Sequence, residues 1–311
     1  MHRRAVREIL ALTLILGLPA GALAAPAPSA RIESFPAPVT ADLARIVSAP
    51  VSSWRSPSAE TYRWNLFPDI LVVDSASFSI QDRLFTRLAY FLEKRGFRGQ
   101  LLGNSRLAGR HGWNAHDYGA AGLADFFTAA QAESFPLNPE EIALRQMALR
   151  EGIIVEARGA YAPGRGGVLG ISRSSSRVER ELLLTHESFH GVFFSSAAYR
   201  EFCQSLWDSL PPPLASFYEH FLDSLGYDVT APTLVVNEFQ AYLMQQPLSY
   251  AESYFERFLK LREGAADESS PEPVQPWQLL KNAEALDGFC RARFGFGAGG
   301  PLLASLGSRT P

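Results

Sequence analysis

The stretch VERELLLTHESFHGVFF, residues 178–194, constrains the fold more than any other part of the chain. Drawn as an α-helix, it carries apolar side chains around most of its circumference, so it must be covered on more than one side. Three of its ionisable residues, His186, Glu187 and His190, lie among these apolar side chains in the second half of the stretch. The sequence therefore predicts a helix buried through the middle of the protein.

The three ionisable residues match the spacing H-E-x-x-H. His186 and His190 are one helical turn apart and lie on the same face, so both imidazoles can bind one ion, for which zinc is the expected cofactor. Glu187 flanks the ion instead of binding it. That placement suits a general base, because a carboxylate beside the metal can take a proton from a zinc-bound water.

This pair of histidines leaves a zinc site one protein ligand short, because catalytic zinc is held by three side chains and a water. Glu238 is the best candidate, since it follows Asn237 on a second predicted helix, 48 residues after His190. Glu156 and Glu181 are weaker substitutes. A structural zinc site is disfavoured because such sites usually close with Cys, and the two Cys are far from the motif in sequence.

The combination of HExxH with an Asn-Glu pair on a following helix resembles the gluzincin group of zinc metallopeptidases. The strand-like stretch VLGIS before the motif adds to the likeness. The resemblance implies a zincin-like fold with the HExxH helix at the floor of a cleft. It also implies hydrolysis of peptide bonds, with a peptide or protein as the substrate.

One position departs from well-known gluzincins. Members of the thermolysin type carry an Asp four residues after the ligand Glu, where it orients a histidine, and Tyr242 stands at that position here. Either Tyr242 or another residue must then orient His186. A metzincin is excluded, because its longer motif needs Gly where this chain has Phe193.

Peptide hydrolysis also needs a donor for the developing oxyanion, and Tyr is the natural choice because no His follows Glu238. Tyr242 is our first candidate, and Tyr161, Tyr250 and Tyr254 stay open as alternatives. The strand Val168–Ile171 is expected to pair with an extended substrate through main-chain hydrogen bonds, as edge strands do.

The other histidines and the cysteines receive no catalytic role. His111 and His116 fall in a loop-like segment, which favours surface or structural roles, and His220 is expected on a helix surface. Cys203 and Cys290 are the only two cysteines, and the sequence leaves both a disulfide and two buried free thiols open.

Residues 1–24 are typical of a secretory signal peptide. Three Arg precede an apolar run over residues 9–18, and small residues lead to a cleavage point near Ala24. The alternative, an uncleaved anchor, is disfavoured because the run is shorter than the roughly 20 residues that span a bilayer. No later stretch is long and apolar enough to span a membrane, so we expect a protein exported to the periplasm or the medium.

The order of elements predicts an α+β protein in which a small mixed sheet precedes the HExxH helix and helices follow it. Residues 25–64 are rich in Pro, Ser and Ala and are expected to form an extended lead. Residues 65–311 then form one domain with an N-lobe (65–192) and a C-lobe (193–311), the alternative being a separate domain ending near Pro136. Helices are predicted over 80–95, 122–132, 139–151, 178–194, 214–225, 233–246, 250–262 and 277–293, and strands over 70–73, 153–157 and 168–172, the last two as an antiparallel pair.

Composition limits the classes of partner. The net charge is −3, and removal of residues 1–24, with three Arg and one Glu, takes it to −5, which disfavours nucleic acid. Two functions remain: an exported zinc metallopeptidase, or a catalytically weak or inactive zincin-fold protein that binds or assembles components of the cell envelope. The presence of Glu187 favours the peptidase.

Overall fold

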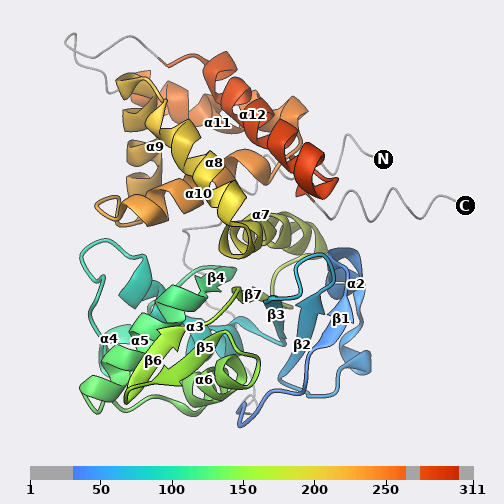
Figure 1. The fold of residues 1–311 in the computed structure, drawn as a ribbon, viewed down its shortest axis with the longest axis vertical. Coiled ribbons are helices and arrows are strands. Elements are labelled where there is room, and N and C mark those ends of the chain that lie inside the picture. Colours follow the sequence, from blue (N-terminus) through green and yellow to red (C-terminus); the bar gives the residue numbers. More distant parts are fainter. Residues whose placement is uncertain (1–30, 264–273, 301–311) are drawn as a thin grey trace, which may run out of the picture.

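The sheet lies on one side of a central helix, α7 (Arg177–Ser195), and the helices that follow α7 in the sequence lie on the opposite side (Figure 1). This computed structural model describes residues 31–263 and 274–300. Within those ranges every strand precedes α7 and only helices follow it, so the predicted α+β class is confirmed. We call the part before α7 the sheet lobe and the part after it, α8–α12, the helical lobe.

The sheet lobe is built on a five-stranded mixed sheet with the strand order β1-β2-β3-β7-β4. Strands β1 and β2 are parallel, β2 and β3 antiparallel, β3 and β7 parallel, and β7 and β4 antiparallel. A separate hairpin joins β5 to β6. The strands are β1 (Val39–Ala41), β2 (Ala59–Trp64), β3 (Ile70–Ser75), β4 (His116–Gly119), β5 (Ile154–Ala157), β6 (Ala160–Pro163) and β7 (Gly167–Ser172).

Helices cover both faces of the sheet, and the helical lobe packs beyond α7 (Figure 1). The helices of the sheet lobe are α2 (Leu43–Ser48), the 3-10 helix η1 (Val51–Ser53), α3 (Phe78–Leu92), α4 (Asn104–Leu107), α5 (Ala120–Ala132) and α6 (Pro139–Arg150). The helical lobe comprises α8 (Ala197–Asp208), α9 (Pro212–Leu225), α10 (Pro232–Met244), α11 (Leu248–Glu263) and α12 (Pro276–Phe294).

Alternation along the strands gives the sheet two apolar faces. Ile70, Val72 and Leu169 belong to the core that contains α7 and the helical lobe. Leu71 and Val73 point the other way, into a second core with α3, α5 and α6. Helix α7 is therefore held between the sheet and the helical lobe.

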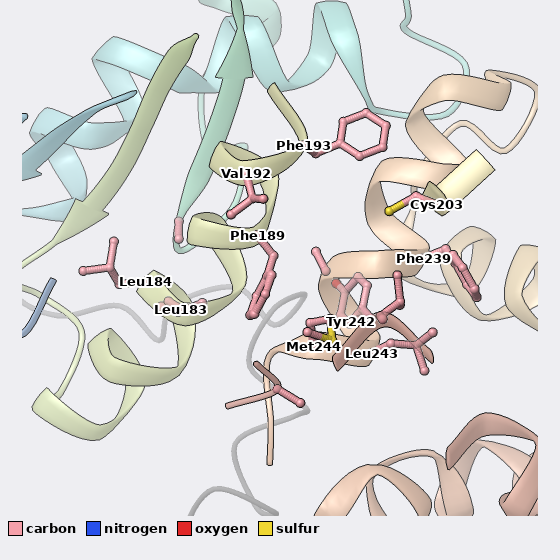
Figure 2. Close-up of a cluster of buried hydrophobic side chains, with 14 of the residues drawn as sticks. Leu183, Leu184, Phe189, Val192, Phe193, Cys203, Phe239, Tyr242, Leu243 and Met244 are labelled. Carbon is pink, nitrogen blue, oxygen red and sulfur yellow. The ribbon is translucent and has the colours of Figure 1, made fainter. Parts of the chain in front are cut away.

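Helix α7 begins at a capping box. The Ser176 hydroxyl accepts from the Glu179 amide, and the Glu179 carboxylate accepts from the Ser176 amide, which satisfies two amides at the helix start. Figure 2 shows Phe189 and Phe193 directed from α7 toward the helical lobe and Leu184 directed toward the strands. Both sides of the helix are thus covered, as its apolar circumference predicts.

The extended lead predicted over residues 25–64 is wrong where the structure describes it. Residues 31–64 contain β1, α2 and β2, and nearly all of β2 is buried in the sheet. The Pro- and Ser-rich composition reports local preference, whereas β2 is stabilised by pairing with β1 and β3 and by burial. The predicted signal peptide, residues 1–24, lies outside the described residues.

The strand assignments also need correction. The segment over 153–157 does not pair with the segment over 168–172, because β5 pairs with β6 and β7 pairs with β3 and β4. Strand β7 is consequently internal, and β4, which the sequence analysis treated as a loop, occupies the sheet edge beside it. An internal strand has both of its edges paired and cannot add a substrate strand.

Among the described residues, eight helices match the predicted ranges closely, whereas α2, α4 and α8 were not predicted. Cys203 and Cys290 are both free and buried. Across residues 31–263 and 274–300, no helix combines the length and apolarity needed to cross a membrane.

A buried ion pair fixes α7 to the end of β3. Arg180 of α7 donates to both Asp74 carboxylate oxygens at 2.8 and 2.9 Å, and Arg173 lies 2.6 Å from the same carboxylate. Asp74 is fully buried and Arg180 nearly so. The negative charge of Asp74 therefore offsets the positive charges of two guanidinium groups near the start of α7.

Replacement of Asp74 by Ala should lower the free energy of unfolding by about 3–5 kcal/mol, because it leaves the Arg180 charge buried without its partner. Urea denaturation followed by circular dichroism measures this difference. Glu181→Gln is the control, since the Arg177–Glu181 pair on the same helix is exposed and should cost about 0.5 kcal/mol or less. Equal losses for the two variants would contradict the assigned role.

Candidate metal centre

Three buried side chains from two helices converge on one point. His186 and His190 come from α7 and Glu238 comes from α10. The two histidine Nε2 atoms are 3.0 Å apart. The Glu238 Oε2 atom lies 3.6 Å from the His186 Nε2 and 3.8 Å from the His190 Nε2. These residues form a group that could hold a metal ion.

The separations fit a metal ion bound by two imidazoles and one carboxylate. Ligand atoms about 2.0–2.1 Å from a tetrahedral zinc are about 3.3 Å from one another, and the three observed distances bracket that value. The Glu238 Oε2 atom is buried without a hydrogen-bond partner. A buried carboxylate oxygen without a donor is costly, and a cation at this point would remove the cost.

Each histidine has a polar neighbour behind it. The His186 Nδ1 lies 3.0 Å from the Gln245 Oε1, which can only accept, so Nδ1 carries the proton and the Nε2 lone pair faces the shared point. The His190 Nδ1 lies 3.6 Å from the Asp117 Oδ2. Such outer contacts fix the tautomer and the ring orientation of metal-binding histidines.

Sequence reasoning missed both outer residues. Gln245 lies seven residues after Glu238, two helical turns along the same face, so helical spacing could have found it. Asp117 belongs to β4 and accepts from the Asn237 Nδ2 at 3.3 Å, a contact between residues 120 positions apart. No local pattern indicates that contact.

Tyr242 takes a different position from the one that an orienting Asp would occupy. Its ring packs edge-on against the His186 ring, with 4.6 Å between centroids, and Gln245 makes the hydrogen bond to that histidine. The Tyr242 hydroxyl lies 3.5 Å from the hydroxyl of Tyr227, a residue that the sequence analysis did not single out. Burial raises the pKa of both phenols well above its ordinary value, so both keep a proton to donate.

Glu187 is buried beside the two histidines, and its Oε2 atom has no hydrogen-bond partner. Together with Asp117 and His190 it forms a second group of possible ligand atoms, which shares His190 with the first. Glu187 thus lies on the side of α7 that faces the edge strand β4.

The site concentrates carboxyl groups in a buried place. Burial raises the pKa of Glu187 well above its ordinary range, and the charges of Glu238 and Glu93 raise it further. Burial, followed by the neighbouring carboxylates, does the same to Asp117. Burial and Glu238 raise the pKa of Glu93 to about 8. A bound divalent cation would reverse these shifts, because it favours the ionised carboxylates.

Burial lowers the pKa of His190 to about 4. The imidazole is therefore neutral near pH 7 and keeps a lone pair for a metal ion. Neutral imidazoles and carboxyl groups together form the donor set that zinc prefers in catalytic sites.

The remaining candidates do not belong to either group of possible ligands. Glu156 is exposed on β5, and Glu181 pairs with Arg177 on the helix surface. Tyr161 packs against Phe127. The other candidates are His111, which contacts Asp82 and Asn114, His116, which is buried against Tyr118, His220, which is exposed on α9, and Tyr250 and Tyr254, which lie on α11.

Comparisons with family models, curated proteins and solved structures find no match to this chain. The chemical interpretation of the site therefore rests on its own residues.

The purified protein should contain close to one zinc per chain, and His186→Ala together with His190→Ala should remove it, because both imidazoles belong to the group that could hold the ion. Elemental analysis measures the ratio. Two single variants identify the group that holds the ion: His186→Ala removes a ligand atom only from the group with Glu238, and Asp117→Ala removes one only from the group with Glu187. Zinc that survives His186→Ala but not Asp117→Ala would contradict this assignment.

Gln245→Ala should weaken zinc binding by about 10- to 100-fold, because the His186 ring loses the contact that sets its tautomer. Competition with a chelating dye measures the dissociation constant. Gln246→Ala is the matched control: this neighbour is equally buried, but its amide donates only to backbone carbonyls of α10. Equal weakening in both variants would indicate a general disturbance of the helix end instead.

Proposed function

We propose that this chain is an exported zinc metallopeptidase of zincin-like fold. The observation that carries the proposal is the convergence of His186, His190 and Glu238 beside a buried Glu187 with a free carboxylate oxygen. The order of sheet, HExxH helix and helical lobe supports the zincin-like assignment, as does the position of α7 between the two lobes. The signal-peptide pattern of residues 1–24 supports export.

The residues divide the chemistry between them. His186, His190 and Glu238 would hold the zinc, which when bound supplies a Lewis acid for a water and a peptide carbonyl. Gln245 holds the His186 imidazole in orientation, and the Asp117 carboxylate lies 3.6 Å from the His190 Nδ1. Their contacts lie on the Nδ1 side of each ring, opposite the shared point.

Glu187 acts as the general base. Its Oε2 atom lacks a donor, so it can accept a proton from a water molecule in the site. Burial raises the pKa of Glu187, and a bound cation would lower it again, so the ionised carboxylate is available as a base when the site is occupied.

An extended peptide fits the edge of the sheet. Strand β4 pairs with β7 on one side and has no other strand partner among the described residues. A peptide that adds to this edge forms main-chain hydrogen bonds beside Asp117, whose carboxylate faces His190. This assigns to β4 the substrate-pairing role that the sequence analysis gave to Val168–Ile171.

Tyr242 remains the proposed donor to the oxyanion. Its ring already contacts the His186 ring, and its hydroxyl lies beside that of Tyr227. Two neutral phenols close to a metal ligand provide the donors that a developing negative charge requires.

Glu187→Gln should keep the zinc but reduce peptide hydrolysis by about 100-fold or more, because the amide cannot take the proton. Digestion of a peptide library, analysed by mass spectrometry beside metal analysis of the same samples, separates the two effects. Glu181→Gln, on the exposed side of α7, serves as the control and should leave both unchanged.

The possible outcomes discriminate between the functions. Loss of zinc together with activity would make Glu187 a ligand or a structural residue and would contradict its role as base. A zinc-loaded wild-type protein that cleaves no peptide would favour the alternative, an inactive zincin-fold protein that binds or assembles envelope components.

A further inference from the structure

Lys94 lies at the junction between the two lobes. It follows Glu93 just after the end of α3, where the backbone of the sheet lobe meets the loop between α9 and α10. The Asp228 amide donates to the Glu93 carbonyl at 2.7 Å, and the Arg95 amide donates to the Gly226 carbonyl at 3.0 Å. Lys94 is therefore anchored on both sides at a junction between the lobes.

The Lys94 ammonium lies over an aromatic ring. Its Nζ atom is 2.8 Å from the centroid of the Trp113 ring. The Tyr227 ring stacks on Trp113 at 4.6 Å with an interplanar angle of 22°, so it occupies one face and leaves the other to Lys94. Trp113 also donates its indole N–H to the Glu93 carboxylate. The side chain of Lys94 is thus held in place by its neighbours.

This arrangement is connected to the metal ligands. Tyr227 lies beside Tyr242, and Tyr242 packs on His186. The Lys94 charge interacts favourably with the carboxylates of Glu93 and Glu238, although burial outweighs them and lowers the pKa of Lys94 to about 7. The ammonium group therefore lies within electrostatic reach of a metal ligand.

Lys94 has no carboxylate of its own. Among residues 31–263 and 274–300, no carboxylate oxygen lies within 4.0 Å of its Nζ atom, and the nearest acidic residue in sequence, Glu93, is engaged by Trp113. Its side chain is only partly buried, so a ligand can approach it. A partly desolvated amine without an ion-pair partner, which ring contacts connect to the candidate metal centre, is a binding point for an anion in its protonated form.

We propose that Lys94 binds a carboxylate of the substrate and so determines which peptides enter the site. The inference rests on the proposed function and specifies its substrate class: peptides that carry a carboxylate close to the bond at the metal. That carboxylate has two sources, the free C-terminus of the peptide or the side chain of an Asp or Glu residue.

The test measures binding rather than turnover. The probes are three N-acetyl tripeptide analogues with a ketomethylene group in place of one peptide bond, which prevents hydrolysis. One has a free C-terminal acid, one is the C-terminal amide, and one is the amide with a Glu side chain. Calorimetric titration into the zinc-loaded wild-type protein gives each dissociation constant.

The wild-type protein should bind one of the two acids about tenfold or more tightly than the neutral amide, the effect of one charged hydrogen bond. Lys94→Met should abolish that preference, because it keeps the apolar stem and removes the charge, whereas Lys94→Arg should retain it. Lys281→Met is the control for charge, since Lys281 is exposed on α12. Lys94→Gln replaces the Met variant if thermal unfolding shows that the Met variant is misfolded.

A preference that survives Lys94→Met, or its absence in the wild type, would overturn the proposal. A role limited to balancing the buried carboxylates would instead change the zinc content and weaken acid and amide equally. The experiment also distinguishes failure of this inference from failure of the proposed function. A Lys94-dependent preference without hydrolysis by the wild type would contradict the peptidase function alone. Hydrolysis without that preference would contradict only the role of Lys94.

Discussion

The burial of α7 on both sides is the constraint on which the rest of the structure depends. The sheet covers one side of this helix and α10 covers the other, so any polar side chain that α7 carries must meet partners from those elements. His186 meets Gln245 and Glu238 from the α10 side, and His190 meets Asp117 from β4. The packing that buries the helix is the same packing that assembles the ligand group.

The part of the site that lies on helices follows from sequence, and the part on strands does not. His186, Glu187, His190 and Glu238 obey short spacings or sit at a recognisable helix position, and local spacing is what an α-helix converts into a shared face. Asp117 reaches the site through the antiparallel pairing of β4 with β7, a contact between distant segments. No periodicity within a segment encodes which strand becomes its neighbour.

The difference between local and long-range contacts also explains why the sheet was predicted less well than the helices. The helix positions were predictable because capping residues and apolar spacing act within one element, as with Ser176 and Glu179 at the start of α7. Composition misassigned residues 31–64, and the order β1-β2-β3-β7-β4 depends on a parallel pairing between β3 and β7 across more than ninety residues. The internal position of β7 moves the free edge to β4, where Asp117 lies, and so places that edge beside His190, one of the candidate ligands.

The buried carboxyl groups around the candidate metal centre couple metal binding to the stability of the fold. Glu93, Asp117, Glu187 and Glu238 interact electrostatically in a buried region, and the two imidazoles bring no positive charge when they are neutral. Burial raises the pKa of Glu93, Asp117 and Glu187, so these carboxyl groups ionise more readily with a divalent ion in place. Zinc binding at this centre would accordingly release protons and stabilise the packing of α7, because carboxylates that gain a cation no longer oppose their own burial.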